Sequence, residues 1–270
     1  MTMKNALKAV ALTSVLGLAL AACGSSKDDN KSGSSSDLNL ISSGTLTVCS
    51  DVPYPPFEDF DKSAPSGFKG FDVDVVSKIA DALKVKLVIK DSDFDPLQSG
   101  LLLTTKKCDL GASAMTITDE RKKHLLFSDG YYDSKQSLLV PADSSIKSIA
   151  DLAGKKVGVQ KGTTGETYTT EHAPDAKRIQ FKDDGTMYLA LKAGTIDAIL
   201  QDLPVNLDHQ NDPKEPGKFK VVETYNTDEE YGFAAAKDNT ALIDAVNKAL
   251  ADMKADGTYQ SIYDTYFAVK

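Results

Sequence analysis

Residues 116–121 place a hydroxyl, a helix start and a cation within six positions, in the order Thr-Ile-Thr-Asp-Glu-Arg. Thr118 is a good helix N-cap, and the two acidic residues after it lie where the helix dipole favours negative charge. The apolar run at 109–114 predicts a buried strand just before this helix. Because open α/β sheets bind ligands outside the carboxyl ends of their strands, a fixed guanidinium at Arg121 suits a carboxylate. The alternative is an ordinary solvated helix charge.

Strands and helices alternate along the body of the chain, which predicts an α/β protein with parallel sheets. The predicted strands are 46–50, 85–89, 109–114, 137–140, 156–160, 197–200, 219–223 and 232–236. The predicted helices are 70–83, 97–104, 118–124, 148–154, one that opens near Glu166, 187–193, one that carries the apolar stripe 242–253, and one that carries the aromatic stripe 259–266.

Several loops at predicted strand ends carry polar or aromatic side chains. Three prolines within residues 51–57 rule out regular structure, so this stiff loop could hold Asp51 and Tyr54 in place, although a plain rigid turn is the alternative. Phe94 lies in a short loop as one exposed-looking aromatic residue. The small-residue loop 161–165 opens a helix with its N–H groups directed above the sheet, but it lacks the Gly-Lys-Ser/Thr ending of a nucleotide loop.

The composition is that of a soluble globular protein with about two domains. Of its 270 residues, 41% are hydrophobic and 26% are charged, and the formal net charge is -8. This acidic balance, with no basic stripe, argues against a nucleic-acid partner. Local charge still decides whether an anionic group can bind.

The amino terminus has the pattern of a secretion signal. Lys4 and Lys8 precede an apolar run at 9–22 that is too short to span a membrane comfortably. The run ends in Leu-Ala-Ala-Cys, which resembles the bacterial lipobox and implies cleavage before Cys23 and lipid attachment to it. Residues 24–36 are rich in Ser, Gly, Asp and Lys, and they predict a flexible tether. The expected location is extracytoplasmic, with the protein held at the bacterial cell membrane by lipid.

Two further cysteines, Cys49 and Cys108, would lie in an oxidising compartment and could pair. Cys49 is late in one predicted strand, whereas Cys108 comes just before another. In parallel neighbours this offset separates them by several residues of rise, which favours two buried thiols over a disulfide. No Cys-x-x-Cys pair occurs, so no metal site is expected.

Four motifs, in the same order and at matching spacing, resemble the polar amino-acid-binding proteins of ABC importers, the family 3 solute-binding proteins. They are the Pro-Pro-Phe-Glu loop at 55–58, Gly-Phe-Asp-Val-Asp-Val at 70–75, Met-Thr-Ile-Thr-Asp-Glu-Arg at 115–121, and Phe-Ser-Asp-Gly-Tyr-Tyr at 127–132. The resemblance runs from about Leu46 to Phe267.

The resemblance implies a periplasmic-binding-protein-like α/β fold, with two lobes joined by two crossing strands and a ligand cleft between them. The segments expected are a lipoprotein signal peptide at 1–22, the lipidated Cys23 and tether at 23–44, lobe I at 45–130 plus 232–270, lobe II at 136–226, and hinge strands at 131–135 and 227–231. Hinge closure over an amino acid and its delivery to a membrane permease are the implied function. A monomer without cofactors is expected.

The resemblance also implies a role for individual residues. Arg121 matches the arginine that binds the ligand α-carboxylate, and Asp202 matches the acid that takes the α-ammonium. These opposite charges would come from opposite lobes, so that only the closed state pairs both charges of a buried zwitterion. The further expected contacts are Thr116 and the main chain of Ala114 to the ligand backbone, Thr163 and Thr164 over the carboxylate, Tyr54 and Phe94 on both sides of the side-chain stem, and Asp51 at the side-chain tip.

Two positions depart from the glutamine-binding members, which have a lysine at Gln160 and a histidine at Gln201. Glutamine both donates and accepts, so these ligand-site candidates discriminate poorly. Asp51 with two aromatic residues favours glutamine, arginine, lysine or histidine as the ligand.

Two other functions fit the same pocket. An amino-acid-sensing surface lipoprotein would signal to a receptor instead of supplying a permease. An enzyme similar to cyclohexadienyl dehydratase would work in the same cleft. The chain has three histidines, all expected on surface helices or loops, and it lacks a Gly-x-Ser-x-Gly elbow and a His-Glu-x-x-His motif. A binding protein is therefore the preferred interpretation.

Overall fold

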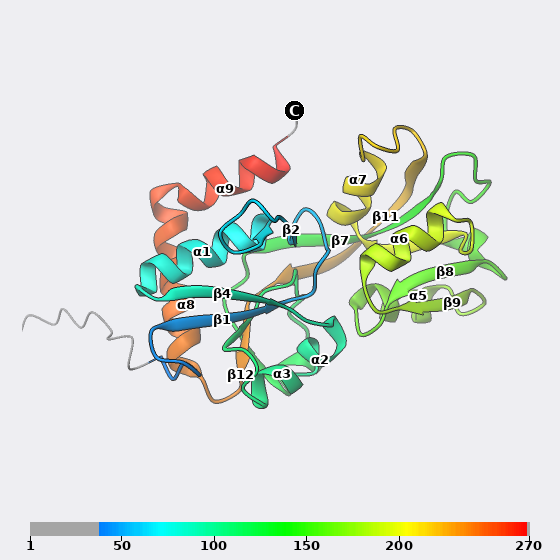
Figure 1. Ribbon diagram of the computed structural model, residues 1–270. Coiled ribbons are helices and arrows are strands. Elements are labelled where there is room, and N and C mark those ends of the chain that lie inside the picture. The colour runs from blue at the N-terminus through cyan, green and yellow to red at the C-terminus, as the bar shows by residue number, and fades with distance from the viewer. Residues whose placement is uncertain (1–37, 269–270) are drawn as a thin grey trace, which may run out of the picture. The chain divides into compact units, whose positions relative to one another are not determined.

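The computed structural model describes residues 38–268 (Figure 1). The predicted signal peptide, Cys23 and most of the tether lie outside these residues. Two five-stranded sheets dominate the described part. The first has the order β4-β1-β5-β12-β6, formed by β4 (Lys86–Asp91), β1 (Thr45–Ser50), β5 (Leu110–Gly111), β12 (Ala234–Ala236) and β6 (Leu125–Phe127). The second has the order β11-β7-β10-β8-β9, formed by β11 (Phe219–Tyr231), β7 (Tyr132–Pro141), β10 (Ala198–Asp202), β8 (Lys156–Gln160) and β9 (Lys177–Phe181).

The prediction of an α/β protein is confirmed, but both sheets are mixed instead of purely parallel. β12 runs antiparallel to both β5 and β6, and β7 runs antiparallel to both β10 and β11. The parallel pairs are β1 with β4 and β5, and β8 with β9 and β10. The antiparallel strands are those on which the chain passes from one sheet to the other, so simple alternation of strands and helices could not reveal them.

Helices accompany each sheet, and each sheet with its helices is called a lobe here. The first lobe holds α1 (Phe71–Leu83), α2 (Phe94–Gln98), α3 (Leu101–Thr104), α4 (Asp119–Lys122), α8 (Thr240–Asp256) and α9 (Thr258–Phe267), with the hairpin of β2 (Asp59–Phe60) and β3 (Phe68–Lys69). The second lobe holds the 3-10 helix η2 (Ile149–Leu152), α5 (Thr164–His172), α6 (Asp184–Lys192) and α7 (Leu203–Gln210). Within residues 38–268 none of these helices has the length and apolar character needed to cross a membrane.

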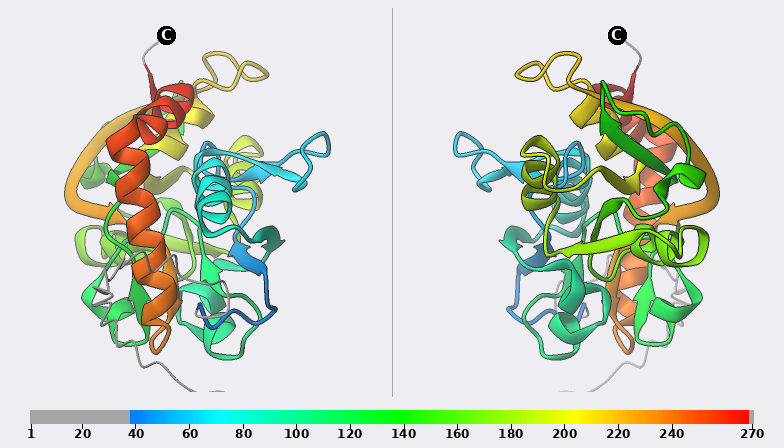
Figure 2. Two further views of the ribbon diagram at one scale, coloured as in Figure 1. Left: turned by 90° about the vertical axis from the view of Figure 1, so that its left-hand side faces the viewer. Right: turned by 90° about the vertical axis from the view of Figure 1, so that its right-hand side faces the viewer.

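The core of the first lobe lies between the sheet and α1 and α8. Val75, Val76 and Ile79 of α1 are buried, as are Val246 and Leu250 of α8. These residues repeat every three or four positions, so each helix turns one apolar face to the sheet. Figure 2 shows α8 in orange leading into α9 in red. The turn between them is Gly257, whose φ of 85° favours glycine.

Two long strands join the lobes. β7 and β11 pair antiparallel from Tyr132 opposite Tyr231 to Pro141 opposite Phe219. The chain enters β7 from the first sheet after β6, and it returns from β11 to β12 in the first sheet. The first sheet is therefore built from both ends of the described chain, with the second lobe inserted between them (Figure 1).

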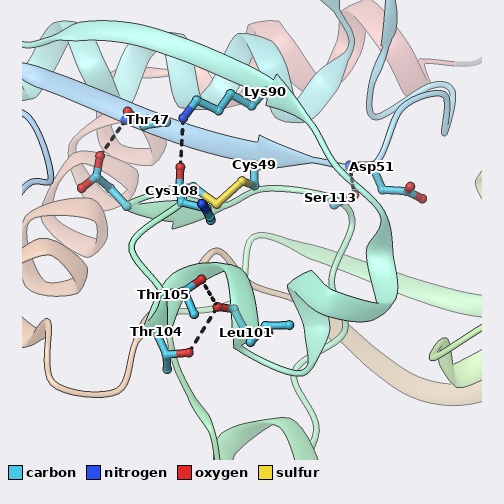
Figure 3. Close-up of a disulfide and its surroundings, with 11 residues drawn as sticks. Thr47, Cys49, Asp51, Lys90, Leu101, Thr104, Thr105, Cys108 and Ser113 are labelled. Carbon is cyan, nitrogen blue, oxygen red and sulfur yellow. Dashed lines mark hydrogen bonds between the residues drawn. A yellow bond between two sulfur atoms is a disulfide. The ribbon is translucent and has the colours of Figure 1, made fainter.

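Cys49 and Cys108 form a disulfide with a Cα–Cα distance of 5.7 Å, so the prediction of two thiols is wrong (Figure 3). The prediction assumed an extended chain from Cys108 into the next strand. β5 begins only at Leu110, and the residues before it leave α3 through a turn. This turn brings Cys108 beside β1, where both cysteines are buried.

The segment after β4 also differs from the prediction. Phe94 is the first residue of α2 and is only 6% exposed, so it is neither in a loop nor exposed. The single helix predicted over 97–104 is divided at Gly100, whose φ of 81° ends one helix before α3 begins. Leu97 is fully buried in the same cluster as Phe94. Burial of Phe94 and Leu97 thus stabilises α2, a helix that the sequence pattern did not indicate.

Candidate functional site

A small cavity lies at the carboxyl ends of strands from both lobes. Ten of the eleven candidate residues line it, and Gln201 is the exception. The lining consists of Asp51, Tyr54, Phe94, Ser113, Ala114, Thr116, Arg121, Gln160, Thr163, Thr164 and Asp202. The strands that end here are β1, β4 and β5 of the first lobe and β8 and β10 of the second. Such a position is the usual one for a ligand in an α/β protein.

Arg121 is held by its own helix start. The Thr118 side chain caps α4 by accepting a hydrogen bond from the Arg121 backbone N–H at 3.1 Å, as predicted. The guanidinium donates to the carbonyl oxygens of Thr116 at 2.7 Å and Gly162 at 3.0 Å, so it contacts both lobes. Its Cζ lies 5.2 Å from the centre of the Phe94 ring. A guanidinium has five N–H groups, so further donors remain for an anionic group in the cavity.

The charge of Arg121 is almost fully desolvated, since the residue is 5% exposed. Burial lowers the pKa of its guanidinium to about 10, while the neighbouring carboxylates of Asp202 and Glu229 oppose this shift. The group therefore stays cationic at neutral pH. A buried cation of this kind is an anion site held ready by the fold.

Asp202 is the last residue of β10 and faces the first lobe. It accepts hydrogen bonds from the hydroxyls of Tyr54 at 2.7 Å and Tyr231 at 2.6 Å, and from the side-chain amide of Gln136. Burial, and secondly the nearby charge of Glu229, raise the pKa of Asp202 to about 7. A cation in the cavity would favour the ionised form of this carboxyl.

Asp51 and Gln160 meet across the cavity from opposite lobes. The Gln160 amide donates to the Asp51 carboxylate and to the Lys182 carbonyl, the latter at 2.9 Å. Asp51 is 4% exposed, and burial raises its pKa to about 7. This end of the cavity thus presents a carboxylate that ionises more readily when a cation or several donors face it.

The floor of the cavity rests on the Gly-Phe-Asp motif. Asp72 Oδ2 accepts from the Ala114 N–H at 2.9 Å and from the Tyr131 hydroxyl at 2.7 Å. Ala114 has a φ of 44°, a conformation that a non-glycine residue adopts only when its surroundings hold it there. Gly70 allows α1 to start against Phe57, because a Cβ at Gly70 would lie 2.1 Å from the Phe57 carbonyl oxygen. The motif therefore positions the backbone at Ala114.

Thr163 and Thr164 form the start of α5 over the cavity. Thr163 caps the helix, because its hydroxyl oxygen accepts from the Glu166 N–H at 3.1 Å. Gly165 lets the helix approach β10 closely, since a Cβ there would lie 3.0 Å from the Leu200 carbonyl oxygen. The N–H groups of the first helical turn carry partial positive charge, which suits an anion.

Gln201 does not reach the cavity. Its amide donates to Asp184 at 2.8 Å and to Asn206 at 3.1 Å inside the second lobe. Asp184 also contacts Nε2 of His209 at 2.9 Å, and the imidazole stacks on Tyr188. His209 is 6% exposed, so the expectation that all three histidines are on the surface is wrong. α7, which was not predicted, carries His209 into the core.

Two buried side chains that the sequence analysis missed connect the lining residues. Glu229 accepts from the hydroxyls of Thr116 at 2.8 Å and Thr164 at 2.7 Å, and Gln136 donates to both Glu229 and Asp202. Glu229 lies within an Asp-Glu-Glu run that looks like a solvated charge cluster. The alternation of strand faces along β11 was the available signal, because Tyr225, Glu229 and Tyr231 are buried while Glu230 is exposed.

Within residues 38–268, no group of three or more histidine, cysteine or acidic side chains is arranged to hold a metal ion. The site thus consists of one buried cation, several buried carboxyls, hydroxyls and a helix start. This set can bind a small molecule that carries both an anionic and a cationic group.

Comparison with known proteins agrees with this chemistry. A family model described as bacterial extracellular solute-binding proteins, family 3, matches residues 46–269. The chain is 33% identical over 219 residues to the ABC transporter arginine-binding protein 1 of Escherichia coli (strain K12), covering 79% of this chain and 87% of that protein. It is 35% identical over 211 residues to the ABC transporter glutamine-binding protein GlnH of Bacillus subtilis (strain 168), covering 75% of this chain and 74% of that protein.

Solved structures show the same similarity. An ancestral arginine-binding protein bound to arginine superposes with a TM-score of 0.77 at 39% identity, over 83% of this chain and 99% of that one. An ancestral amino-acid-binding protein, AncCDT-1, is described as a precursor of cyclohexadienyl dehydratase. It superposes with a TM-score of 0.74 at 37% identity, over 83% of this chain and 95% of that one.

Proposed function

The chain belongs to the bacterial extracellular solute-binding proteins of family 3, and on this basis we propose that it captures a polar or cationic L-amino acid for an ABC importer. The ligand would be glutamine, arginine, lysine or histidine. The observation that carries the proposal is the placement of Arg121 and Asp202, buried side chains from different lobes that line one cavity. Each is costly to bury without an opposite charge, and an amino-acid zwitterion supplies both.

We assign the α-carboxylate to Arg121 and to the backbone N–H groups of Thr163 and Thr164 at the start of α5. The α-ammonium would face Asp202, Thr116 and the backbone of Ala114. The ligand side chain would then extend between Tyr54 and Phe94 towards Asp51 and Gln160. Gln201 is not part of this proposal, because its side chain is engaged inside the second lobe.

Closure of two lobes would complete the site. The proposed lobes are 45–130 plus 232–270 and 136–226, with hinges at 131–135 and 227–231. Tyr54 donates to Asp202 at 2.7 Å, and Lys161 pairs with Asp95 at 2.8 Å, and these contacts between side chains of the two lobes support closure over a ligand. Because each lobe supplies one of the charges, the ligand would favour the closed state.

The location and the partners follow from the same family assignment and from the amino terminus. Cleavage before Cys23 and lipid attachment to it would anchor a monomer to the outer face of the cell membrane. The bound amino acid would then be delivered to a membrane permease. The test is metabolic labelling with a fatty acid, in which Cys23→Ser should remove both the label and the membrane association.

A thermal-shift screen tests ligand binding directly. The chain from residue 37 onward should be unfolded and refolded to strip carried-over ligand, and then heated with each of the twenty amino acids. A ligand present at a hundred times its dissociation constant stabilises the fold by about 2.7 kcal/mol, which is easily detected. One or a few polar hits would support the proposal. No response to any amino acid would overturn it.

The screen also separates the alternatives. An enzyme related to cyclohexadienyl dehydratase would convert its ligand, so chromatography of the protein–ligand mixture should reveal product. None of the three histidines lines the cavity, which favours binding without turnover. A sensory lipoprotein would bind the same ligand, but its deletion would leave uptake of that amino acid unchanged.

A further inference from the structure

Glu229 is a buried carboxylate at the junction of the two lobes. It lies on β11, directly after Asp228, whose φ of 48° marks an irregularity in the strand. Oε2 accepts from Thr116 at 2.8 Å and from Thr164 at 2.7 Å, while Oε1 accepts from Thr227 at 2.8 Å. The Gln136 amide nitrogen lies 3.0 Å from Oε1 and 3.2 Å from Oε2. Four donor groups thus converge on the two oxygens of one carboxyl group.

The hydrogen bonds to Glu229 fix the direction of two hydroxyl protons. A threonine hydroxyl has one proton, and Thr116 and Thr164 each donate theirs in a hydrogen bond to Glu229 Oε2. Both residues also line the cavity. Towards any molecule in the cavity their oxygens can therefore act only as hydrogen-bond acceptors. Without Glu229, each hydroxyl could rotate and donate instead.

The groups next to the two threonine hydroxyls are also hydrogen-bond acceptors. Gln136 Nε2 bridges Glu229 and Asp202, so the two carboxylates lie around one amide group. The ionised form of Asp202 and the two hydroxyl oxygens then offer only hydrogen-bond acceptors to the cavity, whereas the Arg121 guanidinium offers donors. An ammonium group has three donors and no acceptor, and so it is complementary to these acceptors.

We propose that Glu229 is a positioning residue that makes the cavity selective for an α-amine, by holding the Thr116 and Thr164 hydroxyls as acceptors. This inference rests on the proposed function as an amino-acid-binding protein. It adds a selectivity device that lies outside the cavity lining. Glu229 acts on the ligand through the two threonines and through its charge beside Asp202.

The test compares an amino acid with the analogue that lacks only its α-amine. The probes are L-arginine with 5-guanidinopentanoate, and L-glutamine with glutaramate, each titrated into wild-type protein and Glu229→Gln by calorimetry. The measured quantity is the ratio of the dissociation constant of the analogue to that of the amino acid. We expect this ratio to fall at least tenfold in Glu229→Gln. Glu230→Gln is the matched control, because it removes the same charge one residue away on the exposed face of β11.

Two further variants keep the inference falsifiable. Glu229→Asp retains the charge but withdraws it from the hydroxyls, and it should lower the ratio even where Glu229→Gln folds poorly. In a Thr116→Val background, Glu229→Gln should change the ratio less than in the wild-type background. The reason is that the Thr116 hydroxyl, one of the two groups through which Glu229 acts on the ligand, is already absent.

The outcomes separate this inference from the proposed function. If wild-type protein binds none of the twenty amino acids, the proposed function fails and the inference fails with it. If the wild type binds but Glu229→Gln weakens both members of a pair equally, only the selectivity role is overturned. An equal fall of the ratio in Glu230→Gln would assign the effect to general charge and also overturn the role.

Discussion

Arg121 carries its full charge in a position with almost no solvent, and its main charged neighbours are carboxylates. We expect Arg121→Ala to weaken amino-acid binding at least a hundredfold, because the ligand carboxylate would be buried without a partner. Losing one member of a buried charge pair costs about 2–5 kcal/mol in comparable interfaces. Calorimetry gives the affinity, and far-UV circular dichroism verifies the fold.

Arg121→Lys is the matched control for this prediction. It keeps the positive charge but loses the planar fork that reaches both Thr116 and Gly162, so its affinity should fall between those of wild type and Arg121→Ala. Unchanged affinity in the alanine variant would remove Arg121 from the site.

Asp51 lines the cavity beside Gln160, and we expect it to contact the ligand side chain. Asp51→Asn should weaken arginine, lysine and histidine by at least tenfold, and glutamine by less, because only the cationic side chains lose an ion pair. Competition calorimetry with all four amino acids measures this. Asp143→Asn, which changes an exposed carboxylate of the second lobe outside the cavity, should affect none of them. Equal losses for cationic and neutral ligands in Asp51→Asn would show that Asp51 does not contact the side chain.

At the scale of secondary structure, the sequence predicted helices and strands correctly wherever local signals and burial agreed. β8 spans the predicted residues 156–160, and Thr118 caps its helix as expected. The prediction failed where contacts distant in the sequence decide the structure. β9 is exposed along most of its length and carries little apolar pattern, and it forms by pairing with β8. The same limit explains Glu229, since its burial depends on two threonines from separate lobes.

The Cys49–Cys108 disulfide closes a loop of about 60 residues that includes α1, β4 and α2. Removing the constraint on the unfolded chain should lower the free energy of unfolding by about 4 kcal/mol. Urea unfolding of the Cys49→Ser/Cys108→Ser double variant, compared with the oxidised protein, measures the loss. Wild-type protein reduced with dithiothreitol is the control and should show a similar shift of the midpoint. A midpoint that does not move would mean that the disulfide leaves the unfolded chain unconstrained.

For the whole molecule, buried acids couple folding to pH. Burial raises the pKa of Asp51, Asp72 and Asp202 to about 7, whereas an unfolded aspartate has a pKa of about 3.9. The folded state therefore binds more protons between these two values. The stabilisation that these three carboxyl groups contribute is largest below about pH 4, and it is lost as the pH rises through 7.

His209 acts in the same direction. Burial alone would lower its pKa, but the charge and hydrogen bond of Asp184 outweigh burial and raise it. The stabilisation from its protonated form is likewise present at low pH and lost as pH rises through the folded pKa.

We therefore expect a larger free energy of unfolding at pH 5.5 than at pH 8, by about 1.4 kcal/mol per pH unit for each proton taken up. Amino-acid affinity should change in the opposite direction, because Asp202 must be ionised to pair with an ammonium. Urea unfolding and calorimetry at the two pH values test both trends. Asp202→Asn should flatten part of the stability trend. A free energy of unfolding that decreases from pH 8 to pH 5.5 would contradict the prediction.

The position of β12 between β5 and β6 has a consequence for the order in which the chain can fold during synthesis. Residues 45–127 leave the ribosome first, yet their sheet has a gap until residues 234–236 arrive more than a hundred residues later. The second lobe, in contrast, is a continuous stretch and is complete earlier. At about 5–20 residues per second, the first lobe waits several seconds or more for its missing strand. A factor that keeps newly made chains unfolded would therefore have to protect the amino-terminal half the longest.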